Sequence, residues 1–143
     1  MGRKNSVGTA NGLPNGLPNG ERAGGAAAGS GAPVPRHLLV MRTSAMGDVA
    51  MLPHALRALT AAYPDLRVTV ATQAMFSPFF AGLDVGFLDV DVKGAHHSLA
   101  GMWRLAAQAR RLGVDAVADV HDVLRSKAFR LAMRLHGVPA AHI

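Results

Sequence analysis

Short apolar runs and amphipathic segments alternate along the chain from Arg36 onward. The run His37–Met41 is apolar after its first residue, a pattern typical of a strand that is buried on both faces. The next segment, as far as Tyr63, predicts a helix because its apolar residues recur at steps of three and four, namely Val49, Leu52, Leu56 and Leu59. Pro53 has no backbone N–H to donate, so we expect this helix to begin late or to kink there.

The same alternation continues through the rest of the chain. It predicts strands over residues 67–72, 86–92, 115–120 and 139–143, and helices over residues 75–82, 98–112 and 123–136. Ser98 is a plausible N-cap for one of these helices, and Gly113 and Gly137 are placed to end the last two.

Periodicity also predicts which helical residues are buried. In the last helix we expect one apolar stripe to face inward, made of Leu124, Ala128, Leu131 and Leu135. Met102 and Trp103 are expected in the core rather than as a platform for a sugar. The neighbouring residues His96 and His97 lack a third ligand at a useful spacing, so we predict no metal site.

A chain in which strands and helices alternate forms right-handed crossovers and therefore a parallel sheet. The pattern thus predicts an α/β fold, a Rossmann-like parallel sheet with helices on both faces, and the strand order 3-2-1-4-5. In that order the connections diverge between strands 1 and 4, and ligands bind at the carboxyl ends of the strands beside such a switch point. Two loops lie there, residues 43–48 and residues 121–126.

Residues 1–35 differ from the rest of the chain. They hold a tandem repeat, Asn11–Pro14 followed by Asn15–Pro18, and then a stretch rich in small residues over 23–35. Asn-Gly and Pro steps favour turns, and no apolar periodicity is present that would bury a face. We therefore predict a flexible, disordered leader or linker over 1–35, to which we assign no function, and a folded domain over 36–143.

Charge and composition limit the classes of partner that the protein is expected to bind. The formal net charge is +6 and the pI is about 11.1, a balance typical of proteins that bind phosphorylated sugars, a membrane surface or nucleic acid. The chain has no cysteine, which excludes disulfides and thiolate metal sites. No apolar run approaches the roughly 20 residues that span a bilayer.

The loop Arg42–Asp48 carries the first candidate chemistry. Gly47 permits a tight turn from strand to helix, and Asp48 lies at or near the helix start. Asp48 has two interpretations: it complements the helix dipole, or it points into the cleft as a general base. The loop has one glycine where a dinucleotide fingerprint needs three, and the Gly-Lys-Ser/Thr of a P-loop is absent.

Two motifs resemble one known family. Residues 42–49, Arg-Thr-Ser-Ala-Met-Gly-Asp-Val, follow an apolar strand and lead to Tyr63-Pro64-Asp65. Residues 119–126, Asp-Val-His-Asp-Val-Leu-Arg-Ser, lie at the end of the fourth predicted strand, and residues 134–139 follow them. Together they resemble glycosyltransferase family 9, which contains the ADP-heptose:lipopolysaccharide heptosyltransferases. The resemblance covers the chain from His37 to its last residue.

The resemblance implies the N-terminal, acceptor-binding half of a two-domain GT-B glycosyltransferase, with the C-terminal donor-binding domain absent from this chain. It implies inverting transfer of heptose or a related sugar from an ADP-linked donor to a lipid A–core acceptor of lipopolysaccharide, without a metal or other cofactor. Asp48 matches the base that deprotonates the acceptor hydroxyl. The resemblance and the switch point together place the remaining candidates in substrate binding: Arg42, Thr43, Ser44, Gly47, His121, Asp122, Arg125, Ser126 and Lys127. His121 and Asp122 depart from the glycine and uncharged polar residue that are common in the family.

The basic residues of the last predicted helix have two interpretations. Lys127, Arg130 and Arg134 share one helical face, which is expected to be solvated, or alternatively to contact an anionic membrane surface. The expected location is the cytoplasm, with peripheral contact to the inner face of the bacterial inner membrane as the alternative. The rival function is a basic, non-enzymatic module that binds nucleic acid, although no aromatic residues are interleaved with the basic ones.

Overall fold

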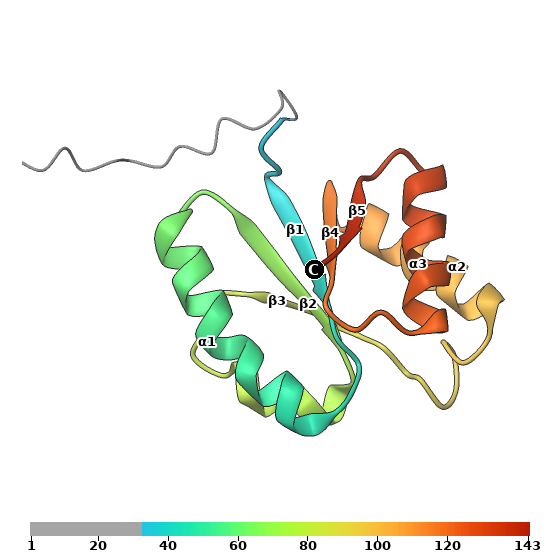
Figure 1. Ribbon diagram of the computed structural model, residues 1–143, viewed down its shortest axis with the longest axis horizontal. Helices are drawn as coiled ribbons and strands as arrows, with labels where there is room; N and C mark the ends of the chain where they lie inside the picture. The colour runs from blue at the N-terminus through green and yellow to red at the C-terminus, as the bar shows by residue number, and fades with distance from the viewer. Residues whose placement is uncertain (1–32) are drawn as a thin grey trace, which may run out of the picture. The chain divides into compact units, whose positions relative to one another are not determined.

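A computed structural model of the protein describes residues 33–143. The predicted leader, residues 1–35, falls almost wholly outside these described residues. Pro33–Ile143 form one unit by themselves, in which strands and helices alternate (Figure 1).

The strands form one parallel sheet. They are β1 (His37–Met41), β2 (Arg67–Thr72), β3 (Gly86–Asp89), β4 (Ala116–Asp119) and β5 (Ala140–His142). The sheet order is β3-β2-β1-β4-β5, which confirms the predicted fold class and strand order. β1 lies at the centre, where Val40 is aligned with Val70 on β2 and with Ala118 on β4.

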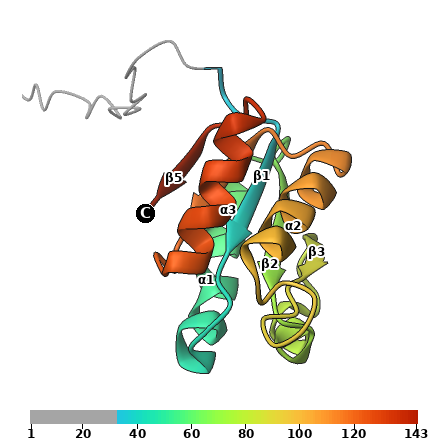
Figure 2. The ribbon, with the colours of Figure 1, turned by 90° about the vertical axis from the view of Figure 1, so that its right-hand side faces the viewer.

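Helices cover both faces of the sheet. They are α1 (Met46–Ala62), the 3₁₀ helix η1 (Ala74–Phe80), α2 (Leu99–Arg111) and α3 (Leu124–Leu135). α1 and η1 pack on one face, and α2 and α3 lie side by side on the other (Figure 2). Each face has its own apolar core, one around Leu56 and Val70 and the other around Leu105 and Phe129.

The predicted helix signals are confirmed for the last two helices. The Ser98 hydroxyl accepts a hydrogen bond from the backbone N–H of Gly101 at 3.1 Å, as an N-cap does. Gly113 and Gly137 both have φ of +80°, the left-handed conformation that ends a helix and that glycine adopts without a steric penalty.

The structure excludes one of the two alternatives for the first helix, a late start. α1 begins at Met46 and runs through Pro53 without a break, so it does not begin late. Proline removes one backbone hydrogen bond, whereas Val49, Leu52 and Leu56 are buried against the sheet. Packing of an apolar face contributes most of the stability of a helix in a protein, and here it outweighs the lost bond.

The predicted inward stripe of α3 was wrong for its three leucines, whereas its fourth member, Ala128, does pack against the core. Leu124, Leu131 and Leu135 are 81%, 57% and 65% exposed, and the buried side is formed by Phe129, Ala132 and Met133. This helix has apolar residues on two sides, so periodicity alone does not choose between them. The orientation of α3 about its own axis is explained by Arg130, whose guanidinium reaches the buried carboxylate of Asp119 at the end of β4.

The two residues of α2 that were expected in the core differ in their burial. Met102 is buried as predicted, but Trp103 is 42% exposed and packs its ring edge-on against His136, with 5.9 Å between the ring centroids. Among residues 33–143, no helix is both long enough and apolar enough to cross a bilayer.

Candidate functional site

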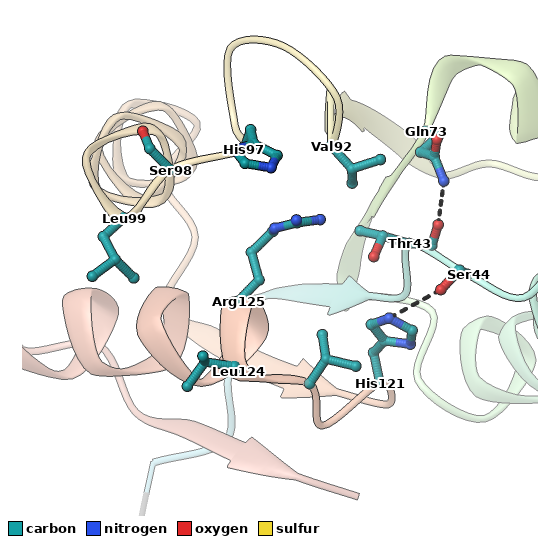
Figure 3. Close-up of a pocket in the computed structure, with 11 residues that line it drawn as sticks. Thr43, Ser44, Gln73, Val92, His97, Ser98, Leu99, His121, Leu124 and Arg125 are labelled. Carbon is teal, nitrogen blue, oxygen red and sulfur yellow. Dashed lines mark hydrogen bonds between the residues drawn. The ribbon is translucent and has the colours of Figure 1, made fainter.

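A pocket of about 710 Å³ opens at the carboxyl edge of the sheet. This is the edge where ligands bind in open α/β sheets. The loops after β1 and β4 line it, together with residues that follow β2 and β3 and the first turns of α2 and α3 (Figure 3). The lining residues are Thr43, Ser44, Gln73, Val92, His97, Ser98, Leu99, His121, Val123, Leu124 and Arg125.

The two loops of the switch point meet within this pocket. The Ser44 hydroxyl lies 3.2 Å from Nε2 of His121, across a sequence separation of 77 residues (Figure 3). The Gln73 side-chain amide donates a hydrogen bond to the carbonyl of Thr43 and so ties the loop after β1 to the end of β2. The site therefore presents a hydroxyl, an amide and an imidazole side by side.

His121 favours its neutral form in this place. Burial lowers the pKa of the imidazole below its usual 6.5, and the nearby guanidinium of Arg42 lowers it further, although the carboxylates of Asp119 and Asp48 act in the opposite direction. A neutral imidazole has one ring nitrogen free to accept a proton. At pH 7 His121 is thus able to receive a hydrogen bond or a proton from a bound hydroxyl group.

We expect the titration of His121 in the folded chain to have a midpoint below that in the unfolded chain. The unfolded state then binds the proton first as the pH falls below about 6.5. His121 therefore disfavours folding progressively from that pH down to its folded pKa, and it has no such effect above pH 7. NMR titration of the ring carbon signals, in buffer and in urea, measures both midpoints. An equal or higher midpoint in the folded protein would contradict the expectation.

Asp48 lies beside the pocket and does not line it. Its carboxylate forms an ion pair with Arg42, and its side chain is 59% exposed in the first turn of α1. Arg42 also donates to the carbonyl of Val120, so this guanidinium links the loop after β1 to the end of β4. Gly47 lies in the same first turn, where a Cβ atom would meet no atom within 4 Å.

The carboxylate of Asp119 holds the loop after β4 in place. Its carboxylate is fully buried, and Oδ1 accepts hydrogen bonds from the backbone N–H groups of His121 at 2.9 Å and Asp122 at 3.2 Å. Oδ2 lies 3.3 Å from Nε of Arg130. Asp122 has φ of +47°, a left-handed conformation that is uncommon outside glycine. The buried carboxylate therefore holds the turn that carries His121 into the pocket.

The charged residues after this turn pair with one another. Asp122 accepts from Nη2 of Arg130 at 3.0 Å and lies 3.7 Å from Nζ of Lys127. Arg134 donates to the carbonyl of Ala140 on β5. The expected solvated face of three cations is therefore wrong for Arg130, whose side chain is only 15% exposed.

The predicted site residues thus divide into two groups. Four of them line the pocket: Thr43, Ser44, His121 and Arg125. The others lie around it: Arg42 and Asp48 as an ion pair, Gly47 in α1, Asp122 and Lys127 as an ion pair, and Ser126 as a buried residue that exchanges hydrogen bonds with the backbone of Val123 at the start of α3. No group of three or more possible metal ligands occurs among residues 33–143.

Sequence reasoning missed the residues that β2, β3 and α2 contribute. Gln73 directly follows β2, and Val92 comes three residues after β3. Because parallel strands end at one edge, the ends of the second and third predicted strands were a usable signal. The sequence signal was weaker for His97, Ser98 and Leu99, because periodicity does not encode the path of the long connection before α2.

No protein-family model and no curated protein matches the sequence. Solved structures do match the fold. One is a glycosyltransferase family 9 protein from Veillonella parvula, with a TM-score of 0.63 and 24% identity over 71% of this chain and 30% of that one. Another is the Escherichia coli ADP-heptose lps heptosyltransferase II, with a TM-score of 0.57 and 20% identity over 74% of this chain and 30% of that one.

A third match belongs to a different kind of enzyme. It is the UDP-GlcNAc 2-epimerase from Neisseria meningitidis bound to UDP-GlcNAc, with a TM-score of 0.53 and 12% identity over 75% of this chain and 32% of that one. This chain therefore spans about a third of the length of each of these proteins. The comparisons establish a Rossmann-like fold that glycosyltransferases share with this epimerase, and the choice between activities depends on the site.

Proposed function

We propose that residues 36–143 form the acceptor-binding domain of an inverting glycosyltransferase of the family 9 type. In this proposal the whole enzyme transfers heptose or a related sugar from an ADP-linked donor to a lipid A–core acceptor, with no metal or other cofactor. The observation that carries it is the meeting of the two loops with family resemblance, through Ser44 and His121, at one pocket on the carboxyl edge of the sheet. The sequence resembles family 9 in two motifs, whereas its likeness to the epimerase rests on the fold alone.

The pocket suits an anionic, hydroxyl-rich ligand. Arg125 supplies a cation, and Thr43, Ser44, Gln73 and His97 supply polar groups, while Val92, Leu99 and Leu124 add apolar walls. Arginine binds carboxylates and phosphates through two parallel hydrogen bonds, and core sugars of the proposed acceptor carry such groups. We infer that the donor nucleotide binds a second domain outside these 143 residues.

The proposed chemistry needs one proton acceptor near the acceptor hydroxyl. As the hydroxyl oxygen bonds to the anomeric carbon and the bond to the leaving diphosphate breaks, the hydroxyl proton becomes acidic and must be taken up. Asp48 is the proposed base, on the strength of the motif, and its carboxylate would have to exchange its partner Arg42 for the hydroxyl. His121 is the second candidate, because it lines the pocket and favours the neutral form.

Acceptor binding tests the proposal with this chain alone. We expect the 143-residue protein to bind a delipidated core oligosaccharide that lacks heptose, in calorimetry at constant salt. Arg125→Gln should weaken binding by about tenfold or more, because hydrogen bonds to charged groups contribute about 1.5–3 kcal/mol. Arg104→Gln is the matched control, since Arg104 is exposed on α2 and does not line the pocket.

The rival function gives a different result in the same experiment. A nucleic-acid module would bind single-stranded oligonucleotides better than the oligosaccharide, with an affinity that falls steeply as salt is raised. That preference, or unchanged oligosaccharide binding by Arg125→Gln, would count against an acceptor site at this pocket.

A further inference from the structure

The solvent face of α3 is apolar. Leu124, Leu131 and Leu135 are separated by seven and four residues, so they lie on one side of the helix, and all three are exposed. We call this stripe the leucine face. Single exposed leucines are ordinary on protein surfaces, but here three exposed leucines share one side of a single helix.

The two helices on this side of the sheet, α2 and α3, carry cations and contain no acidic residue. α2 contributes Arg104, Arg110 and Arg111, and α3 contributes Arg125, Lys127, Arg130 and Arg134, whereas neither helix contains Asp or Glu. Both helices lie on the same side of the sheet (Figure 2). Arg130 and Lys127 are neutralised by the acidic loop before α3, and the arginines of α2 have no carboxylate partner among the described residues.

α2 extends the apolar surface toward the pocket. Leu99 and Trp103 are exposed on α2, and Leu99 lines the pocket mouth together with Leu124. Apolar side chains that include tryptophan, bordered by arginine and lysine, characterise helices that lie in the interface of a membrane. The long stems of arginine and lysine also allow their charges to reach headgroups while the helix lies against the acyl region.

We propose that the outer face of α2 and α3 docks on the surface of an anionic lipid bilayer. The leucine face and Trp103 contact the acyl boundary, and Arg104 and Arg111 contact the lipid headgroups. Charge complementarity favours this occupant over a second copy of the chain, because pairing two such faces would bring cations together without any carboxylate. It is also favoured over nucleic acid, because bases stack on aromatic side chains and this face consists mainly of leucines. The proposal does not depend on the proposed sugar transfer.

Trp103 is the only tryptophan of the chain and lies within the proposed surface, so its fluorescence reports docking directly. We expect the emission of the full 143-residue protein to shift to the blue on vesicles of phosphatidylcholine with one quarter phosphatidylglycerol. Brominated phosphatidylglycerol should quench it. Pure phosphatidylcholine vesicles should need about thirtyfold more lipid, because Arg104 and Arg111 lose their attraction to anionic headgroups there.

Paired variants separate this face from the rest of the surface. Leu131→Ser with Leu135→Ser should raise the lipid concentration for half-maximal binding by about tenfold or more. The reason is that both leucines would leave water on binding, and burial of apolar side chains favours the bound state. Met51→Ser with Met75→Ser, two equally exposed residues of α1 and η1, should leave it unchanged. Arg104→Gln with Arg111→Gln should weaken binding by about thirtyfold, and Arg57→Gln with Arg67→Gln by much less.

Three results would overturn the proposal. The first is that the leucine variant and the arginine variant both bind vesicles as tightly as their control variants do. The second is that the emission of Trp103 stays unchanged on every anionic vesicle. The third is a monomer–dimer equilibrium, seen by ultracentrifugation, that the leucine variant abolishes while vesicle binding stays absent. That third result would assign the face to a second copy. Because the vesicles contain no sugar lipid, none of these results depends on whether the pocket binds the proposed acceptor.

Discussion

Asp48→Asn is expected to lower kcat by about 10²–10⁴-fold, with KM little changed, in a protein that joins this domain to a donor-binding domain. Asparagine keeps the shape of the side chain but does not take up the hydroxyl proton. The accompanying loss of stability should be at most about 1 kcal/mol, because the pair with Arg42 is largely exposed and surface ion pairs contribute little. Steady-state kinetics with an ADP-linked heptose and a heptose-deficient acceptor measure the change.

His121→Gln provides the decisive comparison. If Asp48 is the base, His121→Gln should mainly raise KM, because the imidazole then only positions the acceptor beside Ser44. If His121 takes up the proton, the two outcomes are exchanged. In that case Asp48→Asn leaves kcat within about threefold of its original value, a change of under roughly 1 kcal/mol in the barrier. Asp65→Asn, on an exposed turn, serves as the control for a general charge effect.

Asp119→Ala is expected to cost about 3–5 kcal/mol of the free energy of unfolding, because removing one partner leaves a largely buried guanidinium underpaired. The substitution also removes the acceptor for two backbone N–H groups of the following turn. Urea unfolding followed by circular dichroism measures the loss in the 143-residue chain. Asp65→Ala should stay within about 0.5 kcal/mol of the original protein, as exposed substitutions do.

The double variant Asp119→Ala with Arg130→Met tests the cause of that loss. Methionine leaves no charge to be compensated, so the double variant should recover part of the stability. A single-variant loss below about 1 kcal/mol, or a double variant less stable than the sum of both single changes, would show that the Asp119–Arg130 pair is not what holds the loop.

The sequence was sufficient for the sheet and for the place of the site. The apolar run His37–Met41 and the β-branched run Arg67–Thr72 coincide with β1 and β2, because a strand buried on both faces leaves few alternatives for its residues. Alternation with helices then dictated parallel pairing and the switch point between β1 and β4. The pocket lies there because the carboxyl ends of parallel strands meet at one edge.

The tertiary structure decided which side chains face that pocket and which sides of the helices are buried. Sequence placed Asp48 and His121 in the same two loops, but only the folded chain pairs Asp48 with Arg42 and brings His121 to Ser44, since these contacts depend on loop paths that no local pattern encodes. The sequence of α3 has apolar residues on two sides of the helix, and either side was compatible with burial against the sheet. The buried pair of Arg130 with Asp119 is made only by the rotation that turns Phe129 inward and the leucine face outward, because a buried charge needs a partner within reach.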